Sequence, residues 1–66
     1  MKAQIITIGD EILIGQIIDT NSAWLATELN VLGISVDSIF SISDTSDAIQ
    51  GALNDVPKDV SLVLMT

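Results

Sequence analysis

Residues 5–22 read IITIGDEILIGQIIDTNS, an apolar run and a glycine followed by a stretch rich in carboxylates and hydroxyls. The apolar run, residues 3–8, is nearly continuous, which is typical of a strand covered on both faces of a parallel sheet. After a loop over residues 10–20, four residues that favour helix N-caps stand in a row, namely Asp19, Thr20, Asn21 and Ser22. Open α/β sheets build binding sites where such strands deliver polar side chains to a helix start.

The rest of the chain repeats this alternation of strand and helix. A helix from residues 19–22 to about Leu32 is indicated by the spacing of Leu25, Leu29 and Leu32, with Gly33 as its left-handed terminator. Residues 35–43 read as a second strand. A second helix follows the cap cluster at 44–47, and Pro57 stops it.

Residues 60–65 complete the series as a third buried strand, so the predicted order is β-α-β-α-β. Strands that alternate with helices of about ten residues predict a parallel sheet with right-handed crossovers. We therefore expect an α/β fold with three α/β/α layers. The loop at 10–20 is expected as a short extended excursion, with a turn at Gly15.

Composition excludes several classes of function. The net charge of −7 repels phosphate backbones, so we expect no nucleic-acid partner and a cation wherever a ligand carries phosphates. The chain has no cysteine and no histidine, which excludes disulfides, thiolate chemistry and imidazole-based sites within it. It also has no apolar run of about 20 residues and no signal peptide, so we expect no membrane partner and a cytoplasmic protein.

The chain has a high share of hydrophobic residues for its short length. The 66 residues are 48% hydrophobic, and a chain of this size buries only about 60% of its unfolded surface. A sheet of three strands also leaves exposed edges. We expect a piece of a larger domain or a homo-oligomer; a compact minidomain with an apolar surface is the alternative.

Neither common glycine-rich phosphate loop fits. Gly9 and Gly15 are separated by five residues with no third glycine after them, which excludes the dinucleotide fingerprint. Gln16 stands where the nucleoside-triphosphate loop needs lysine.

Carboxylates follow the first two strands. Asp10 and Glu11 come directly after residues 3–8, and Asp44 follows residues 35–43. Since parallel strands end at one sheet edge, Asp10 and Asp44 are expected there together, as a divalent cation or a general base requires. The plainer interpretation is a polar turn at Asp10 and Glu11 and an N-cap at Asp44.

The cluster at residues 19–22 is also open to two interpretations. Free N–H groups and the helix dipole favour an anionic ligand there. Simple capping explains one or two of its four polar residues. Trp24 and Leu25 are expected in the core, with Trp24 as an interface anchor as the alternative.

The order of these residues resembles the amino-terminal domain of the CinA family of competence- and damage-inducible proteins. The resemblance rests on GDEIL at 9–13, GQI at 15–17 and DTNSAWLA at 19–26, and it continues through Leu29, Gly33, Asp44 and Ile49. This family is related to the MoaB/Mog and MoeA molybdopterin-binding proteins. The resemblance implies a three-layer α/β/α fold that is often oligomeric and binds a pterin or nucleotide phosphate at the strand ends.

The resemblance also implies roles for individual residues. Asp10, Glu11 and Asp44 would hold a divalent metal ion, with Asp10 and Asp44 catalytic. The substrate would be bound by residues Asp19, Thr20, Asn21, Ser22 and Thr66. Beyond the threonine matched by Thr66, the family continues into a glycine-rich anion loop and an aspartate. Residues 1–66 are therefore expected to be the front portion of a single such domain, inactive alone.

The function implied for the intact parent is hydrolysis of ADP-ribose-like nucleotides by a metal-dependent pyrophosphatase. Two alternatives remain open: a molybdopterin-binding module of molybdenum cofactor synthesis, and an inactive structural fragment.

Overall fold

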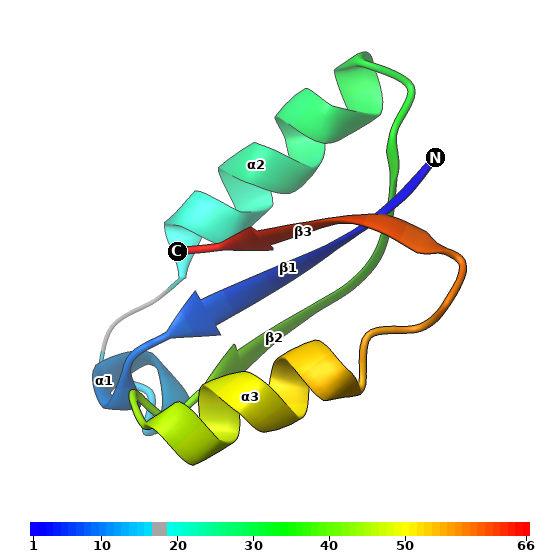
Figure 1. Cartoon of the computed structure of the whole chain (residues 1–66). Coiled ribbons are helices and arrows are strands. Elements are labelled where there is room, and N and C mark those ends of the chain that lie inside the picture. Colours follow the sequence, from blue (N-terminus) through cyan, green and yellow to red (C-terminus); the bar gives the residue numbers. More distant parts are fainter. Residues whose placement is uncertain (17–18) are drawn as a thin grey trace.

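Three parallel strands form the centre of the molecule. The structure is a computed structural model that describes residues 1–16 and 19–66. The strands are β1 (Lys2–Ile8), β2 (Ser35–Ile42) and β3 (Val60–Met65), and their order in the sheet is β2-β1-β3. The strand that comes first in the sequence is therefore the central one (Figure 1).

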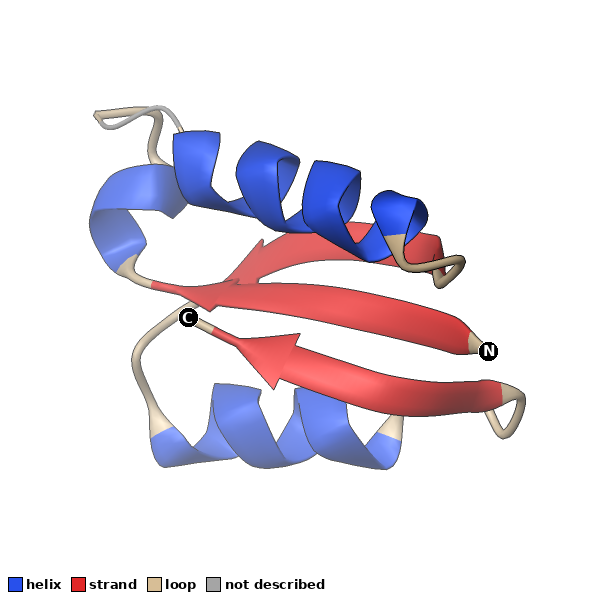
Figure 2. Ribbon diagram, turned by 90° about the horizontal axis from the view of Figure 1, so that it is seen from above, coloured by secondary structure: helices blue, strands red, loops and turns tan. Residues whose placement is uncertain are grey.

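Helices cover both faces of this sheet. A short helix, α1 (Asp10–Leu13), follows β1, and α2 (Thr20–Val31) and α3 (Ser46–Asn54) connect the strands. Figure 2 shows α2 over one face and α3 over the other. The predicted β-α-β-α-β order and three-layer α/β/α arrangement are confirmed.

The core lies between β1 and α2. Ala3, Ile5 and Leu29 form its buried centre. Along β1, Ala3 is paired with Val36 and Leu62 on the neighbouring strands. Partly buried apolar residues of α2, β2 and β3 pack around this cluster, namely Leu25, Ala26, Ile34, Val36, Leu62 and Leu64.

Polar pairs join the two strands β1 and β2 at matching positions. The Gln4 side-chain amide donates to Ser38 Oγ at 3.0 Å, and the Thr7 and Ser41 hydroxyls are hydrogen-bonded to each other. Gln4 and Thr7 are buried. A shift of the strand register would leave these groups unpaired in the interior, so they fix the alignment of β1 with β2.

The ends of α2 follow the sequence signals. Asp19 is the N-cap, and its Oδ1 accepts the Ser22 backbone N–H at 3.0 Å. Gly33 has a φ of 81°, and the Ile34 N–H donates to the Leu29 carbonyl at 2.9 Å, which is the bond of a Schellman motif. Gly15 has a φ of 79°, as the predicted turn requires.

The structure differs from expectation after β1 and at the end of β2. Asp10–Leu13 forms the helix α1 where an extended excursion was expected, because Asp10 and Glu11 favour a helix start and Ile14 N–H bonds back to the Asp10 carbonyl. In addition, β2 ends at Ile42 rather than at Ser43, whose carbonyl instead accepts the Thr45 N–H.

Trp24 does not lie in the core. Its side chain is 62% exposed, so the prediction of a core tryptophan is wrong. The cause is helical geometry, because Trp24 lies about 140° around α2 from the buried Leu29. Leu25 is half-buried against the core, as expected, whereas Leu32 at the helix end is 74% exposed.

Candidate functional site

All three strands end at one edge of the sheet. The Ile8 N–H donates to the Thr66 carbonyl at 2.9 Å, and the Gly9 N–H donates to the Ile42 carbonyl at 3.1 Å. These bonds place Gly9, Ile42 and Thr66 side by side, and we call their neighbourhood the carboxyl edge. The beginnings of α1 and α3 adjoin it, and α2 begins on the same side of the sheet (Figure 1).

Gly9 brings Glu11 close to the backbone at this edge. Its φ of 154° lies in a region that side chains disfavour, and a Cβ on Gly9 would lie only 2.8 Å from Glu11 Oε1. The Glu11 carboxylate therefore folds back over the Gly9 Cα at the start of α1. Asp10, its neighbour, is exposed.

The predicted metal ligands do not form a complete site by themselves. Asp10, Glu11 and Asp44 are all exposed. Among residues 1–16 and 19–66, no three acidic side chains lie close enough together to hold a metal ion. The assignment of these ligands stays a prediction, and a divalent ion at the carboxyl edge would need ligands from beyond them.

The four polar residues at the start of α2 divide into three roles. Asp19 is engaged as the N-cap. Ser22 is only 2% exposed, and its hydroxyl has no hydrogen-bond partner in the described part of the chain. Thr20 and Asn21 are exposed in the first turn, the part of a helix whose backbone N–H groups have no partner within the helix and can suit an anion.

Asp44 is free of the capping role that the sequence suggested. Thr45 is the N-cap of α3, and its Oγ1 accepts the Ala48 N–H at 3.2 Å. The interpretation of Asp44 as the N-cap is therefore wrong. Its carboxylate is exposed two residues beyond Ile42, beside the carboxyl edge where the functional interpretation expects it.

Sequence reasoning missed two polar groups that the fold uses. Thr45 was hidden in a run of four cap-forming residues, any of which has the chemistry of an N-cap. Gln4 lies in the apolar run of β1, and its Oε1 is buried without a partner among the residues described. Its only signal was the presence of a long amide within a strand predicted to be buried.

An ion pair lies at the end of the sheet opposite the carboxyl edge. There Lys2 Nζ lies 2.7 Å from Asp59 Oδ2. This hydrogen bond and charge contact lower the pKa of Asp59 and raise the pKa of Lys2. Both groups are exposed and far along β1 from the carboxyl edge, so this pair stabilises the fold rather than a site.

None of the helices in the described ranges is long and apolar enough to cross a membrane. The predicted cytoplasmic location stays a prediction.

Comparison with known proteins finds CinA-like proteins that are similar to this chain over nearly all of its residues. A CinA-like protein of Flavobacterium psychrophilum is 48% identical over 66 residues, which is 100% of this chain and 16% of that protein. A CinA-like protein of Cytophaga hutchinsonii is 50% identical over 64 residues, or 97% of this chain and 15% of that protein. The chain therefore spans about a sixth of the length of these curated relatives.

A solved structure has the same fold. The crystal structure of the protein CinA from Thermoplasma acidophilum, described as of unknown function, superposes with a TM-score of 0.89 at 33% identity. The match covers 97% of this chain and 38% of that one. Residues 4–66 also match the family model described as "Probable molybdopterin binding domain". The chain thus belongs to this molybdopterin-binding domain family, and its CinA-like members are similar to it along its whole length.

Proposed function

We propose that this chain supplies the first part of a binding site for a phosphate-bearing nucleotide or pterin. The observation that carries the proposal is the carboxyl edge, where Gly9, Ile42 and Thr66 are joined by backbone hydrogen bonds. Ligands of open α/β sheets bind outside the carboxyl ends of the strands. In this chain the same edge carries the exposed Asp10 and Asp44.

Different groups of this chain would bind different parts of the ligand. The positive end of α2, with Thr20 and Asn21 in its first turn, suits the phosphate. The Thr66 hydroxyl would donate from the neighbouring strand end. Asp10 and Asp44 repel a bare phosphate, so the ligand must arrive with a cation or present hydroxyls to these carboxylates.

The buried Ser22 hydroxyl supports an incomplete site. A buried hydroxyl without a partner costs about 1–3 kcal/mol, so intact domains rarely keep one. Its partner would come from segments that follow in the longer relatives, of which this chain spans about 16%.

For the intact parent we further propose hydrolysis of the pyrophosphate of ADP-ribose-like nucleotides, with Asp10 and Asp44 at the reacting end. The second candidate is a molybdopterin-binding module without hydrolysis. It is favoured by one specific observation, that residues 4–66 match the family model described as "Probable molybdopterin binding domain".

The decisive assay uses the intact parent with ADP-ribose, with and without Mg²⁺, and measures AMP by chromatography. Asp44→Asn should abolish AMP release, and Asn21→Ala should weaken ADP-ribose binding. Glu28→Gln is the matched control, because it removes an exposed carboxylate in the last two turns of α2, away from the helix start.

Two outcomes would overturn parts of this proposal. If the parent releases no AMP but binds molybdopterin, the hydrolase is excluded and the binding module stands. The 66-residue chain should show no turnover and weak metal affinity, so tight stoichiometric metal binding in calorimetry would contradict the incomplete site.

A further inference from the structure

The outer edge of β2 is an unpaired strand edge. In the described sheet, β2 is hydrogen-bonded to β1 alone. Because the Ile42 carbonyl accepts from Gly9 on β1, the backbone groups of Ile39 and Ser41 point the other way, out of the sheet. Soluble proteins usually protect such edges with lysine, proline or a covering segment. In β2, whose sequence is SVDSIFSI, the only charge is Asp37, at a register irregularity near its start.

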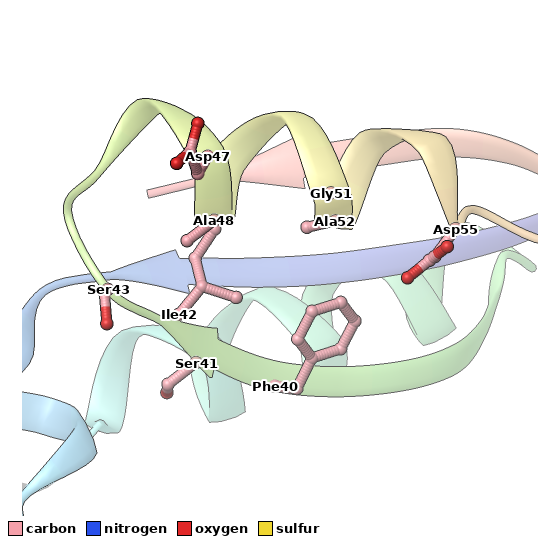
Figure 3. Close-up of a pocket in the computed structure, with 9 residues that line it drawn as sticks. All are labelled: Phe40, Ser41, Ile42, Ser43, Asp47, Ala48, Gly51, Ala52 and Asp55. Carbon is pink, nitrogen blue, oxygen red and sulfur yellow. The ribbon is translucent and has the colours of Figure 1, made fainter.

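A groove runs between this edge strand and α3. It has a volume of about 460 Å³, and Phe40 and Ile42 point from β2 toward the helix (Figure 3). The helix side of the groove is formed by small residues, Ala48, Gly51 and Ala52. A methyl group added at Gly51 would meet no atom within 4 Å, so there is room for a side chain beside α3.

The acidic side chains of this groove favour a positively charged binding partner. Asp47, in the first turn of α3, and Asp55, its C-cap, line the groove eight residues apart. Among the described residues, its lining has no lysine or arginine. The whole chain carries a net charge of −7. Two copies paired through β2 would bring two such acidic surfaces together, which disfavours a second copy as the occupant.

From this geometry we infer that β2 and the groove bind an extended, basic segment of a partner protein, which adds a fourth strand to the sheet. Its backbone pairs with Ile39 and Ser41, in the mode by which extended peptides extend sheet edges. The spacing of the acids fixes its sequence pattern. Eight helical residues rise about 12 Å, and four strand residues span about 13 Å.

The segment therefore carries basic residues at positions i and i+4, opposite Asp47 and Asp55, with an apolar residue at i+2 in the groove. The groove meets the carboxyl edge at Ile42, but the outward backbone groups of β2 and the two acids take no part in the proposed ligand site. The inference therefore does not depend on the proposed ligand or hydrolysis.

The test uses the 66-residue chain and two synthetic peptides with blocked ends, TKTVTKT and TETVTET. Binding is followed by the shifts of the backbone amide signals in NMR spectra. TKTVTKT should move the signals of Ile39 and Ser41, with an affinity that falls as salt is added. TETVTET should bind at least about tenfold more weakly.

Two variants test the parts of the surface, and two more serve as controls. Ile39→Pro removes an outward N–H and should abolish binding, whereas Ile39→Val keeps it and should bind normally. The double variant Asp47→Asn with Asp55→Asn changes only exposed groups and should weaken TKTVTKT about tenfold. Glu28→Gln on α2, on the other face of the sheet, should leave the affinity unchanged.

The inference is overturned if TKTVTKT moves no signals of β2, or if TETVTET binds equally well. It is also overturned if the Asp47/Asp55 double variant binds with unchanged affinity. The double variant changes only exposed side chains and is expected to keep the fold. Its affinity for TKTVTKT therefore tests the inference even if Ile39→Pro fails to fold.

Discussion

Glycine at position 9 links the end of β1 to the start of α1 through a backbone shape that other residues adopt only with strain. The same position brings the Glu11 carboxylate against the chain, with 2.8 Å between Oε1 and the place of a Cβ. The turn at the carboxyl edge therefore depends on the absence of a side chain.

Gly9→Ala should lower the free energy of unfolding by about 1–3 kcal/mol, because it adds backbone strain and displaces Glu11. Gly51→Ala is the matched control. It lies within α3 with open space around it, and it should raise the same free energy by about 0.5–1 kcal/mol. Urea unfolding followed by circular dichroism measures the free energy of unfolding of both variants. A change of the same sign in the two variants would contradict this prediction.

The Asp19 carboxylate is expected to stabilise the start of α2, whereas the buried Ser22 hydroxyl, three residues later, is expected to destabilise the fold. Asp19→Ala removes the N-cap of α2 and should cost about 0.5–2 kcal/mol of stability. Ser22→Ala removes a buried hydroxyl that has no partner among residues 1–16 and 19–66, so this chain should lose no stability or become more stable.

Thermal unfolding of the two variants gives the comparison. A loss of more than about 1 kcal/mol in Ser22→Ala would mean that its hydroxyl is already satisfied in this chain.

At the scale of elements, the start of α3 has one capping residue among four candidates. Thr45→Ala should lower the free energy of unfolding by about 1 kcal/mol, because the Ala48 N–H loses its acceptor. Asp44→Ala should leave it nearly unchanged. Chemical unfolding of both variants checks the assignment, which a larger effect at Asp44 would reverse.

The pair of Lys2 and Asp59 joins the beginnings of β1 and β3. Because Lys2 lowers the pKa of Asp59, the stabilisation from Asp59 is present above its ordinary pKa of about 3.9 and is lost as the pH falls through the lower, folded value. The raised pKa of Lys2 has the reverse sign. Its contribution is present below about 10.4 and is lost as the pH rises through the folded value.

We therefore expect Asp59→Asn to be slightly less stable than the parent near neutral pH and to lose this difference in strong acid. Both side chains are largely exposed, so the effect is small. Urea midpoints measured from pH 2 to 8 test it. If the stability difference between Asp59→Asn and the parent stays constant over this pH range, the lower stability of the variant does not come from the lost charge.

Elements with a strong apolar pattern could be predicted from sequence, and short polar junctions could not. Residues 60–65 and the ends of α2 were predicted correctly, because continuous apolar runs, Asp19 and Gly33 each act locally. The helix α1 was missed because four residues give no period to read. The exposure of Trp24 depends on which face of α2 meets the sheet, and a single apolar position does not reveal that.

The candidate site was predictable in outline only. Parallel strands put Asp10 and Asp44 beside one edge, and hydrogen bonds between Gly9 and Ile42 agree with that placement. The side-chain directions at the edge depend on backbone angles such as those of Gly9, which the sequence does not encode as a pattern. The assignments of metal, substrate and oligomeric state stay predictions.

At the scale of the whole molecule, the buried apolar core is small. Within the described residues, the buried apolar side chains are Ala3, Ile5, Ile6, Leu29 and Ala52. Large apolar residues at the end of α2 face solvent, with Val31 78% exposed and the C-cap Leu32 74% exposed. A chain of this size rarely gains more than about 3–5 kcal/mol from a single core.

We expect the 66-residue chain to unfold in urea with a free energy below about 5 kcal/mol. A longer piece of the parent that covers the exposed apolar residues of α2 should be clearly more stable. Two-state urea transitions of both proteins measure this. A value above about 8 kcal/mol for the short chain would contradict the account of a small core.

The central place of β1 in the sheet has a consequence for synthesis on the ribosome. Lys2–Ile8 is made before both of its neighbours in the sheet, and the second of them, Val60–Met65, is made only after β2 and α3. At roughly 5–20 residues per second, this apolar segment waits about 3–12 s for that second neighbour. During this time it is the part of the nascent chain most open to chaperones or to aggregation.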